Sequence, residues 1–314
     1  MTLLFTLCIC THNRADLLAA ALESACSQQL SGAEYEVLVV DNRSTDETAA
    51  VVQSFRERYH DLRCVLEGEL GASSARNRGW REAKGEYLAY LDDDGVAPPG
   101  WLAQAAEIVR QHNPPVFGGP FVSYYRTRPP AWYKDAYGSW VPFDEVRLMG
   151  PEDGSLCAGN LFIRRSVLEQ SGGFLPELGV RGEQGGFAEE TELLIRLHRL
   201  FPGEYFVYHP GLRIQHLVRP EKWDLCWMAR TSFTRGRHSY LAYSSGRHPL
   251  QPRHLLGLAG LPLIIAWESS AGVLLRSRKR YPYWQNYYYE VVMGRVSVWG
   301  KLVERLSQLW KGAQ

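Results

Sequence analysis

Short apolar runs alternate with helical patterns along the first 90 residues. The apolar runs predict strands over residues 3–10, 36–40, 63–66 and 86–91. Apolar residues at helical spacing predict a helix that ends near residue 28, a second helix is expected to end near residue 59, and a run rich in small residues from Gly71 predicts the start of a third. Ser44-x-x-Glu47 has capping-box spacing for the second helix. Strands that alternate with helices in this way form a mostly parallel sheet with helices on both faces.

The pattern becomes less regular after residue 95. We expect helices over residues 99–112 and 188–200 and strands over residues 156–163, 205–208 and 212–217. An aromatic-rich stretch over residues 121–143 either stacks on a sugar ring or packs on the sheet with its own side chains. The chain is therefore expected to hold an α/β domain over residues 1–218, with halves of about 1–95 and 96–218, and a helical region over residues 219–314.

Three adjacent carboxylates, Asp92 to Asp94, follow the fourth predicted strand. Carboxylates a few ångströms apart repel one another, and a divalent cation such as Mg²⁺ or Mn²⁺ removes the conflict. Parallel sheets bind ligands at the carboxyl ends of their strands, where Asp41 and the segment Thr11-His12-Asn13-Arg14 also lie. The pattern therefore predicts one polar crevice with a cation site, whereas the alternative for the acidic run alone is a solvated turn.

Composition narrows the class of protein. With 314 residues, 45% apolar content and 22% charge, the chain can bury a large core and is not disordered. The six cysteines lack zinc spacing, and the apolar run over residues 3–10 is short and has no basic leader, which predicts no signal peptide. We therefore expect buried free thiols at Cys8 and Cys10 and a reducing, cytoplasmic location.

The net charge of +1 conceals an asymmetry. Residues 1–218 hold 20 Lys+Arg and 29 Asp+Glu and are acidic. Residues 219–314 hold the other 15 Lys+Arg and 5 Asp+Glu and are basic. There, the uncharged segment Leu255–Trp267 precedes Glu268, and the basic run Arg276–Arg280 follows. Because a spanning helix needs about 20 apolar residues, we expect peripheral contact with an anionic membrane, at the inner face of the plasma membrane, and no nucleic-acid contact. The alternative is a buried helix packed on the α/β domain.

Six short polar motifs occur in a fixed order along the chain. They are Thr11-x-Asn13-Arg14, Asp41-Asn42-x-Ser44-Thr45-Asp46, Gly71 with Ala75-Arg76-Asn77-x-Gly79, Asp92-Asp93-Asp94, Ala158-Gly159-Asn160 and Glu189-Glu190. In this order and spacing, residues 3–218 resemble the family 2 glycosyltransferases of the GT-A fold, which are inverting enzymes that use nucleotide sugars. The resemblance implies a Rossmann-like, mostly parallel sheet flanked by helices, followed here by a helical C-terminal extension.

The resemblance also implies roles for single residues. The positions expected at the nucleotide and the donor sugar are Thr11, Asn13, Arg14, Asp41, Arg76, Asp92, Asp93, Gly159 and Asn160. Those expected at a Mn²⁺ or Mg²⁺ ion are Asp94, Asp92 and His216, although a lone histidine on a strand is often structural. The catalytic base of the family falls at Glu190, in a pattern that usually reads Glu-Asp and here reads Glu-Glu, so the base is either Glu190 or Glu189.

These parts suit a single in-line displacement at an anomeric carbon, which inverts it. Departure of a nucleoside diphosphate needs charge stabilisation, which a metal supplies, and the acceptor hydroxyl needs a base. We expect transfer from a nucleotide sugar, a UDP-sugar by resemblance, to a glycan or lipid-linked glycan in bacterial surface polysaccharide synthesis. Two alternatives are a sugar nucleotidyltransferase, which would carry a glycine-rich loop after its first strand, and a non-catalytic scaffold at the membrane.

Overall fold

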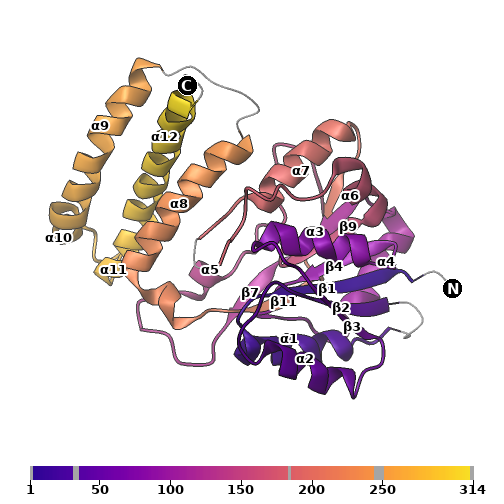
Figure 1. Cartoon of the computed structure of the whole chain (residues 1–314). Coiled ribbons are helices and arrows are strands. Elements are labelled where there is room, and N and C mark those ends of the chain that lie inside the picture. Colours follow the sequence, from indigo (N-terminus) through magenta and orange to yellow (C-terminus); the bar gives the residue numbers. More distant parts are fainter. Residues whose placement is uncertain (1–2, 31–34, 183–184, 244–250, 312–314) are drawn as a thin grey trace. The chain divides into compact units, whose positions relative to one another are not determined.

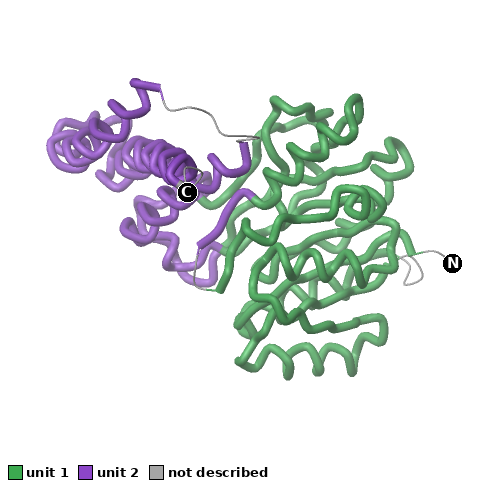
Figure 2. Tube along the Cα trace, turned by 45° about the horizontal axis from the view of Figure 1, so that its top comes forward, with its two compact units in different colours: residues 1–124, 138–183, 189–217 green, residues 125–137, 184–188, 218–314 purple. Residues whose placement is uncertain are grey.

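The computed structural model of the chain describes residues 3–30, 35–182, 185–243 and 251–311. Contacts divide the chain into two units, residues 1–124, 138–183 and 189–217 in the first and residues 125–137, 184–188 and 218–314 in the second (Figure 2). The sequence analysis placed all of residues 1–218 in one domain, whereas the structure groups two of its segments with the C-terminal helices. For residues 125–137 the reason is packing, because Trp132 and Tyr133 are buried with Met228 and Met293.

The first unit follows the predicted alternation of strands and helices. Its elements are β1 (Phe5–Thr11), α1 (Ala15–Cys26), β2 (Tyr35–Asp41), α2 (Thr48–Arg56), β3 (Leu62–Leu66), α3 (Ala72–Glu82), β4 (Tyr87–Leu91), β5 (Gly95–Val96), α4 (Trp101–His112), β6 (Val116–Gly118), β7 (Phe121–Tyr124), β8 (Arg147–Met149), β9 (Asn160–Arg164), α6 (Arg165–Ser171), α7 (Glu189–Leu200), β10 (Phe206–Tyr208) and β11 (Ile214–Leu217) (Figure 1). The short helix α5 (Asp135–Gly138) lies where the chain passes from the second unit back to the first.

The described residues form a central sheet with the strand order β3-β2-β1-β4-β9-β6-β10-β8. β1 pairs in parallel with β2 and β4, and β2 with β3, whereas β9 runs antiparallel to β4 and β6. The mostly parallel α/β class expected from the sequence is confirmed. Because parallel strands end at the same edge of a sheet, Thr11, Asp41 and Leu91 all lie toward one edge, and Thr11 pairs with Asp41 in register.

The two faces of β1 pack into different apolar clusters. Phe5, Leu7 and Ile9 belong to the cluster that includes residues of α1 and α4, whereas Cys8 packs with residues of α3 and α7. This is the period of two that a buried strand requires. A Cβ at Gly79 would lie 2.5 Å from Cys8 Sγ, so glycine lets α3 approach the sheet closely. Cys8 is buried as expected, Cys10 is only partly buried, and all six cysteines are free thiols.

The start of α2 differs from the expected capping box. Asp46, not Ser44, bonds to the first residue of the helix, because its Oδ1 accepts from the Thr48 N–H at 3.1 Å and from Thr48 Oγ1 at 2.6 Å. Asp46 Oδ2 also accepts from the Ala15 N–H at 3.0 Å, at the start of α1. Ser44 Oγ instead accepts from the Asn13 N–H at 3.0 Å. The capping-box prediction was therefore wrong, and one aspartate serves the first turns of two helices.

The second unit is helical, as expected for the C-terminal region. Its elements are η1 (Pro220–Trp223), α8 (Leu225–Tyr243), α9 (Pro252–Trp267), η2 (Glu268–Gly272), α10 (Val273–Leu275), α11 (Trp284–Tyr287), η3 (Tyr288–Val292) and α12 (Met293–Lys311). Helix α12 packs against both α8 and α9 (Figure 1). A Cβ at Gly300 would lie 2.1 Å from the Phe233 carbonyl oxygen, so α8 and α12 are in near backbone contact there. Residues 244–250 and 312–314 of the region predicted to be helical lie outside the described residues.

Candidate active site

The acidic run Asp92-Asp93-Asp94 begins directly after β4 ends at Leu91. A tight turn follows, because the Gly95 N–H donates to the Asp92 carbonyl oxygen at 2.9 Å. The side chains of Asp93 and Asp94 are 5% and 6% exposed, whereas that of Asp92 is 34% exposed. The turn therefore buries two of the three carboxylates, which is not the solvated acidic turn of the alternative reading.

Arg14 pairs with this buried acid. Its Nη1 donates to Asp93 Oδ1 at 2.8 Å and lies 3.6 Å from Asp94 Oδ2. Burial raises the pKa of Asp93 to about 6, although Arg14 acts to lower it. Burial also acts to lower the pKa of Arg14, but the carboxylates of Asp93 and Asp94 outweigh this and raise it. Arg14 therefore stays charged and neutralises part of the acidic run.

Asp92, Asp94 and His216 form a group that can hold a cation. Their ligand atoms all lie within 4.8 Å of one another, and His216 Nε2 is 3.3 Å from Asp94 Oδ1. His216 reaches this place because β11 pairs antiparallel with β5, which sets it opposite Gly95, directly after the acidic run. Two carboxylates and an imidazole fit a divalent ion such as Mn²⁺. The structure thus brings together the three residues expected at the metal.

Arg76, in α3, links the acidic run to the start of α7. Its Nη1 donates to Glu189 Oε1 at 2.8 Å and its Nη2 donates to Asp92 Oδ1 at 3.2 Å. Arg76 and Glu189 are 8% and 7% exposed. Burial acts to lower the pKa of Arg76, but the charges of Glu189 and Asp92 outweigh it and raise the pKa above its usual value. Arg76 is therefore a buried cation held by two carboxylates.

Glu190 has different surroundings from Glu189, although both lie in the first turn of α7. Its side chain is partly buried. Burial and, after it, the charge of Glu189 raise the pKa of Glu190 to about 8, against a lowering effect of Arg76. A carboxyl group with a pKa near neutrality is suited to proton transfer. The two glutamates that the sequence left as alternatives thus differ, since the carboxylate of Glu189 is ion-paired with Arg76 and the pKa of Glu190 is raised by burial.

The loop before β9 brings Gly159, but not the side chain of Asn160, to the acidic run. A Cβ at Gly159 would lie 2.4 Å from Asp92 Oδ2, so glycine is required beside that carboxylate. Asn160 is 0% exposed. Its Nδ2 donates to two backbone carbonyl oxygens and its Oδ1 accepts from Trp101 Nε1. Gly159 therefore lies directly beside the acidic run, whereas the amide of Asn160 holds the interior of the fold together.

The other positions expected at the nucleotide lie at the ends of β1 and β2. Thr11 and Asp41 are the last residues of these strands and are 3% and 5% exposed. Asp41 Oδ1 accepts from the Ser44 N–H at 2.9 Å. Asn13 adopts a left-handed conformation with φ of 51°, and its Oδ1 accepts from the Thr45 N–H at 2.7 Å. These side chains shape the two loops at the edge of the sheet where the acidic run lies.

The sequence analysis gave no role to Asn42, which fixes the loop before α3. Its Nδ2 donates to the carbonyl oxygens of Glu67 and Glu69, and its Oδ1 accepts from the Gly71 N–H at 2.7 Å. Its position directly after Asp41, at the end of a strand, was a signal for such a role.

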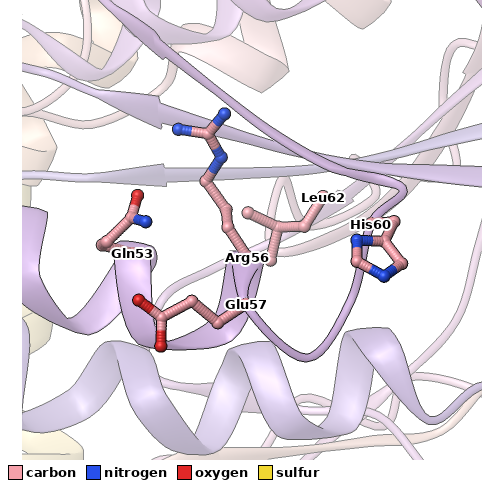
Figure 3. A pocket seen from close by; sticks show the side chains of 5 residues that line it. All are labelled: Gln53, Arg56, Glu57, His60 and Leu62. Atoms are coloured by element: carbon pink, nitrogen blue, oxygen red, sulfur yellow. The ribbon is translucent and has the colours of Figure 1, made fainter.

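A surface pocket lies elsewhere on the first unit, at the end of α2 and the start of β3. It is lined by Gln53, Arg56, Glu57, His60 and Leu62 (Figure 3). Because β3 is parallel to β2, its first residue lies at the edge of the sheet opposite to the acidic run. The side chains of Arg56 and Glu57 point away from each other in Figure 3. None of the expected site residues lines this pocket.

The fold is shared with known glycosyltransferases. The structure of the mannosyltransferase PcManGT from Pyrobaculum calidifontis, in complex with GDP-Man and Mn²⁺, is similar to this chain with a TM-score of 0.66. At 21% identity, the match covers 97% of this chain and 87% of that one. The chain therefore has the GT-A fold that the sequence predicted, with a helical C-terminal region.

The sequence places the chain within a family. The pattern described as glycosyl transferase family 2 matches residues 6–172, which is more than half of the chain. The chain therefore belongs to glycosyl transferase family 2 and is an enzyme of the glycosyltransferase class, which confirms the predicted resemblance.

Two curated relatives support this family. The chain is 29% identical to glycosyltransferase AglE of Haloferax volcanii over 52% of this chain and 53% of AglE. It is 26% identical to the succinoglycan biosynthesis protein ExoM of Rhizobium meliloti over 80% of this chain and 79% of ExoM. The chain thus spans about half the length of AglE and most of ExoM.

Proposed function

We propose that the chain transfers a sugar from a nucleotide-sugar donor to a hydroxyl group of a glycan or lipid-linked glycan, with inversion at the anomeric carbon and with a divalent metal. The observation that carries this proposal is the group of Asp92, Asp94 and His216, which Arg76 connects to the start of α7, where Glu190 lies. A cation site and a carboxyl group suited to proton transfer are the two parts that such a displacement needs.

Asp92, Asp94 and His216 are the proposed metal ligands. Carboxylates suit both Mn²⁺ and Mg²⁺, and the imidazole favours Mn²⁺, because Mg²⁺ takes oxygen ligands almost exclusively. A divalent ion bound there would supply positive charge that stabilises the departing diphosphate. The Mn²⁺ in the PcManGT complex supports this choice of ion.

Glu190 is the proposed base for the acceptor hydroxyl. Glu189 is less suited to that role because its carboxylate is buried against the guanidinium of Arg76, at 2.8 Å. The pKa of Glu190, raised to about 8 by burial and by the charge of Glu189, makes it a stronger base than an ordinary glutamate once it is deprotonated. The proton of the acceptor hydroxyl would pass to the Glu190 carboxylate as the new glycosidic bond forms.

The proposed donor site lies at the ends of β1, β2 and β4. Thr11, Asn13 and Asp41 would contact the base and the ribose, and Arg14 would balance the charge of the acidic run beneath the diphosphate. We propose a UDP-sugar on the basis of the family resemblance, and the GDP-Man bound to PcManGT makes a GDP-sugar the second candidate. The name of ExoM supports a polysaccharide product.

A donor panel tests this function. Release of nucleoside diphosphate is measured from UDP- and GDP-sugars with Mn²⁺ or with EDTA, for the wild type, Asp94→Ala and Glu190→Gln. The proposal expects turnover of one donor class that needs metal and that both substitutions reduce by about 100-fold or more. Nucleotide binding without any turnover would instead favour the scaffold, and pyrophosphate release from a nucleoside triphosphate and a sugar phosphate would favour a nucleotidyltransferase.

An exposed apolar helix in the second unit supports the proposal that the acceptor is at a membrane. The continuous helical segment 252–275 is the one stretch among the described residues that is long and apolar enough to cross a bilayer, and only 11% of its apolar window is buried. Leu256, Leu263 and Leu274 are 74%, 73% and 80% exposed. Within the second unit this exposure favours contact with a membrane over the alternative of a buried helix.

We propose that this segment lies in the membrane interface rather than across the bilayer. Glu268, in the C-terminal third of the segment, is 7% exposed and lies 3.5 Å from Arg295 of the same unit. A charged residue at the centre of a bilayer costs about 3 kcal/mol, whereas an interfacial helix keeps Glu268 on its protein side. The basic run Arg276–Arg280 follows directly and is attracted to anionic headgroups. This arrangement favours a cytoplasmic protein at the inner face of the plasma membrane.

Flotation with liposomes tests the membrane proposal. Wild type should float with vesicles that contain anionic lipid, and Leu263→Asp together with Leu274→Asp should stay at the bottom of the gradient. Leu66→Asp, at an equally exposed leucine of the first unit (71%), is the matched control and should float. Equal flotation of all three proteins would refute the interfacial helix.

A further inference from the structure

Arg76 is a buried cation shared between two carboxylates that belong to different parts of the site. One is Glu189, at 2.8 Å, in the first turn of α7, and the other is Asp92, at 3.2 Å, in the proposed metal group. The backbone around the arginine is also fixed, because Tyr90 Oη donates to the Arg76 carbonyl oxygen at 3.1 Å. The ring of Phe174 lies 5.7 Å from the guanidinium carbon. Arg76 therefore has little freedom to turn away from either carboxylate.

The two carboxylates differ in how they are exposed. The side chain of Glu189 is 9% exposed and that of Asp92 is 34% exposed. Gly179 leaves room for the side chain of Glu189, because a Cβ at this position would lie 3.3 Å from Glu189 Cδ. Glu189 is thus the enclosed partner of Arg76, and Asp92 is the partner that can also face a ligand.

We propose that Glu189 is a positioning residue that acts through Arg76 and leaves the carboxylate of Asp92 available to the metal ion. With Glu189 in place, the positive charge of Arg76 is balanced inside the protein, and Asp92 receives one long hydrogen bond that fixes its orientation. Without the charge of Glu189, Arg76 has Asp92 as its main counter-ion and competes with a divalent cation for it. This inference rests on the proposed metal site and goes beyond it, because Glu189 is not one of the proposed metal ligands and reaches them only through Arg76.

A substitution that removes the charge of Glu189 gives the first test. Glu189→Gln keeps the length of the side chain and removes its charge, and Mn²⁺ binding to the full chain is followed without nucleotide by the electron paramagnetic resonance signal of the free ion. We expect binding about tenfold weaker than in the wild type, which is the scale of one charge-assisted hydrogen bond. Glu192→Gln is the matched control, because it makes the same charge change in α7 at a residue paired with Arg196, and it should bind Mn²⁺ as the wild type does.

A double substitution separates this inference from a general loss of structure. Arg76→Met together with Glu189→Gln removes the whole ion pair, so no buried charge is stranded and no arginine competes for Asp92. The double variant should bind Mn²⁺ more tightly than Glu189→Gln alone and within about threefold of the wild type, because the interaction energy of the pair cancels in the double substitution. Binding by Glu189→Gln that equals the wild type, or a double variant that is as weak as the single one, would overturn the inference.

Steady-state kinetics add a second readout. Glu189→Gln should raise the Mn²⁺ concentration needed for half-maximal rate and largely retain kcat at saturating Mn²⁺, whereas loss of a base lowers kcat itself. A collapse of kcat in Glu189→Gln with unchanged Mn²⁺ binding would make Glu189 the base and would overturn its positioning role. A wild-type chain that takes up no Mn²⁺ would instead refute the proposed metal site, so the two failures are distinguishable.

Discussion

The adjacent glutamates of α7 should respond to neutralisation in opposite ways at alkaline pH. Glu190 has a pKa raised from 4.5 to about 8 by burial and then by the charge of Glu189. A carboxyl whose pKa is raised on folding stabilises the folded state below its unfolded pKa, and this stability is lost as the pH rises through the folded pKa. At pH 8.5 the charged Glu190 therefore lowers the free energy of unfolding of the wild type, which it does not do at pH 4.5. Glu190→Gln removes this loss of stability.

The size of this effect follows from the shift of the pKa. One unit corresponds to about 1.4 kcal/mol, and because Glu190 keeps some contact with solvent we expect a gain of about 2 kcal/mol at pH 8.5. Glu189→Gln should have the opposite sign, since it breaks a buried ion pair with Arg76, and should cost about 1–3 kcal/mol. Neutralising one carboxylate thus stabilises the protein and neutralising its neighbour destabilises it.

Thermal unfolding of the three proteins at pH 4.5 and pH 8.5 measures these effects. With about 2–4 °C per kcal/mol for a chain of this size, the midpoint of Glu190→Gln should exceed that of the wild type by about 5 °C at pH 8.5 and equal it at pH 4.5. The midpoint of Glu189→Gln should lie below the wild type at pH 8.5. A Glu190→Gln variant that is destabilised at both pH values would refute the assignment of a raised pKa.

Three further predictions concern the same site. Activity at saturating Mn²⁺ should rise with pH through the pKa of Glu190, near 8, and a rate that is flat between pH 6 and pH 9 would count against this base. Gly159→Ala would set a Cβ 2.4 Å from Asp92 Oδ2, so we expect at least tenfold weaker Mn²⁺ binding by calorimetry with little change in the unfolding midpoint. Asn160→Ala should lower the free energy of unfolding by about 2–3 kcal/mol in denaturant titrations, because it strands buried carbonyl groups, and a loss of donor binding without any loss of stability would show that its amide faces the substrate instead.

The parts of the fold that the sequence predicted are those with strong local signals. The strands from β1 to β4 have short apolar runs, the helices between them have periodic, capping or small-residue signals, and the structure confirms all of these elements. The strands β5 to β8 have only two to four residues each and were not predicted, whereas the equally short β10 and β11 were predicted. The start of α2 was misread because Ser44 and Asp46 are both good caps, and the choice between them depends on Asn13 and Ala15, which are distant in the sequence.

In the candidate site, too, the features with local sequence signals were predicted and those set by distant contacts were not. The acidic run and the glycine beside it could be read as motifs, because each lies at a strand end or in a loop with a local pattern. The different surroundings of Glu189 and Glu190 could not be predicted, because they depend on Arg76, which reaches α7 from another helix. The burial of the Asn160 amide depends in the same way on a distant partner, Trp101. Long-range contacts of buried polar groups leave no periodic trace in the sequence.

The central claim is that Asp92, Asp94 and His216 hold a divalent ion that binds together with a nucleoside diphosphate. Isothermal titration of UDP, and in parallel of GDP, into the protein with and without saturating Mn²⁺ tests it most directly, with Asp94→Ala as the comparison. We expect Mn²⁺ to tighten the binding of one of the two nucleotides by at least about tenfold and Asp94→Ala to abolish this gain. Affinities that are the same with and without Mn²⁺ for both nucleotides would contradict it.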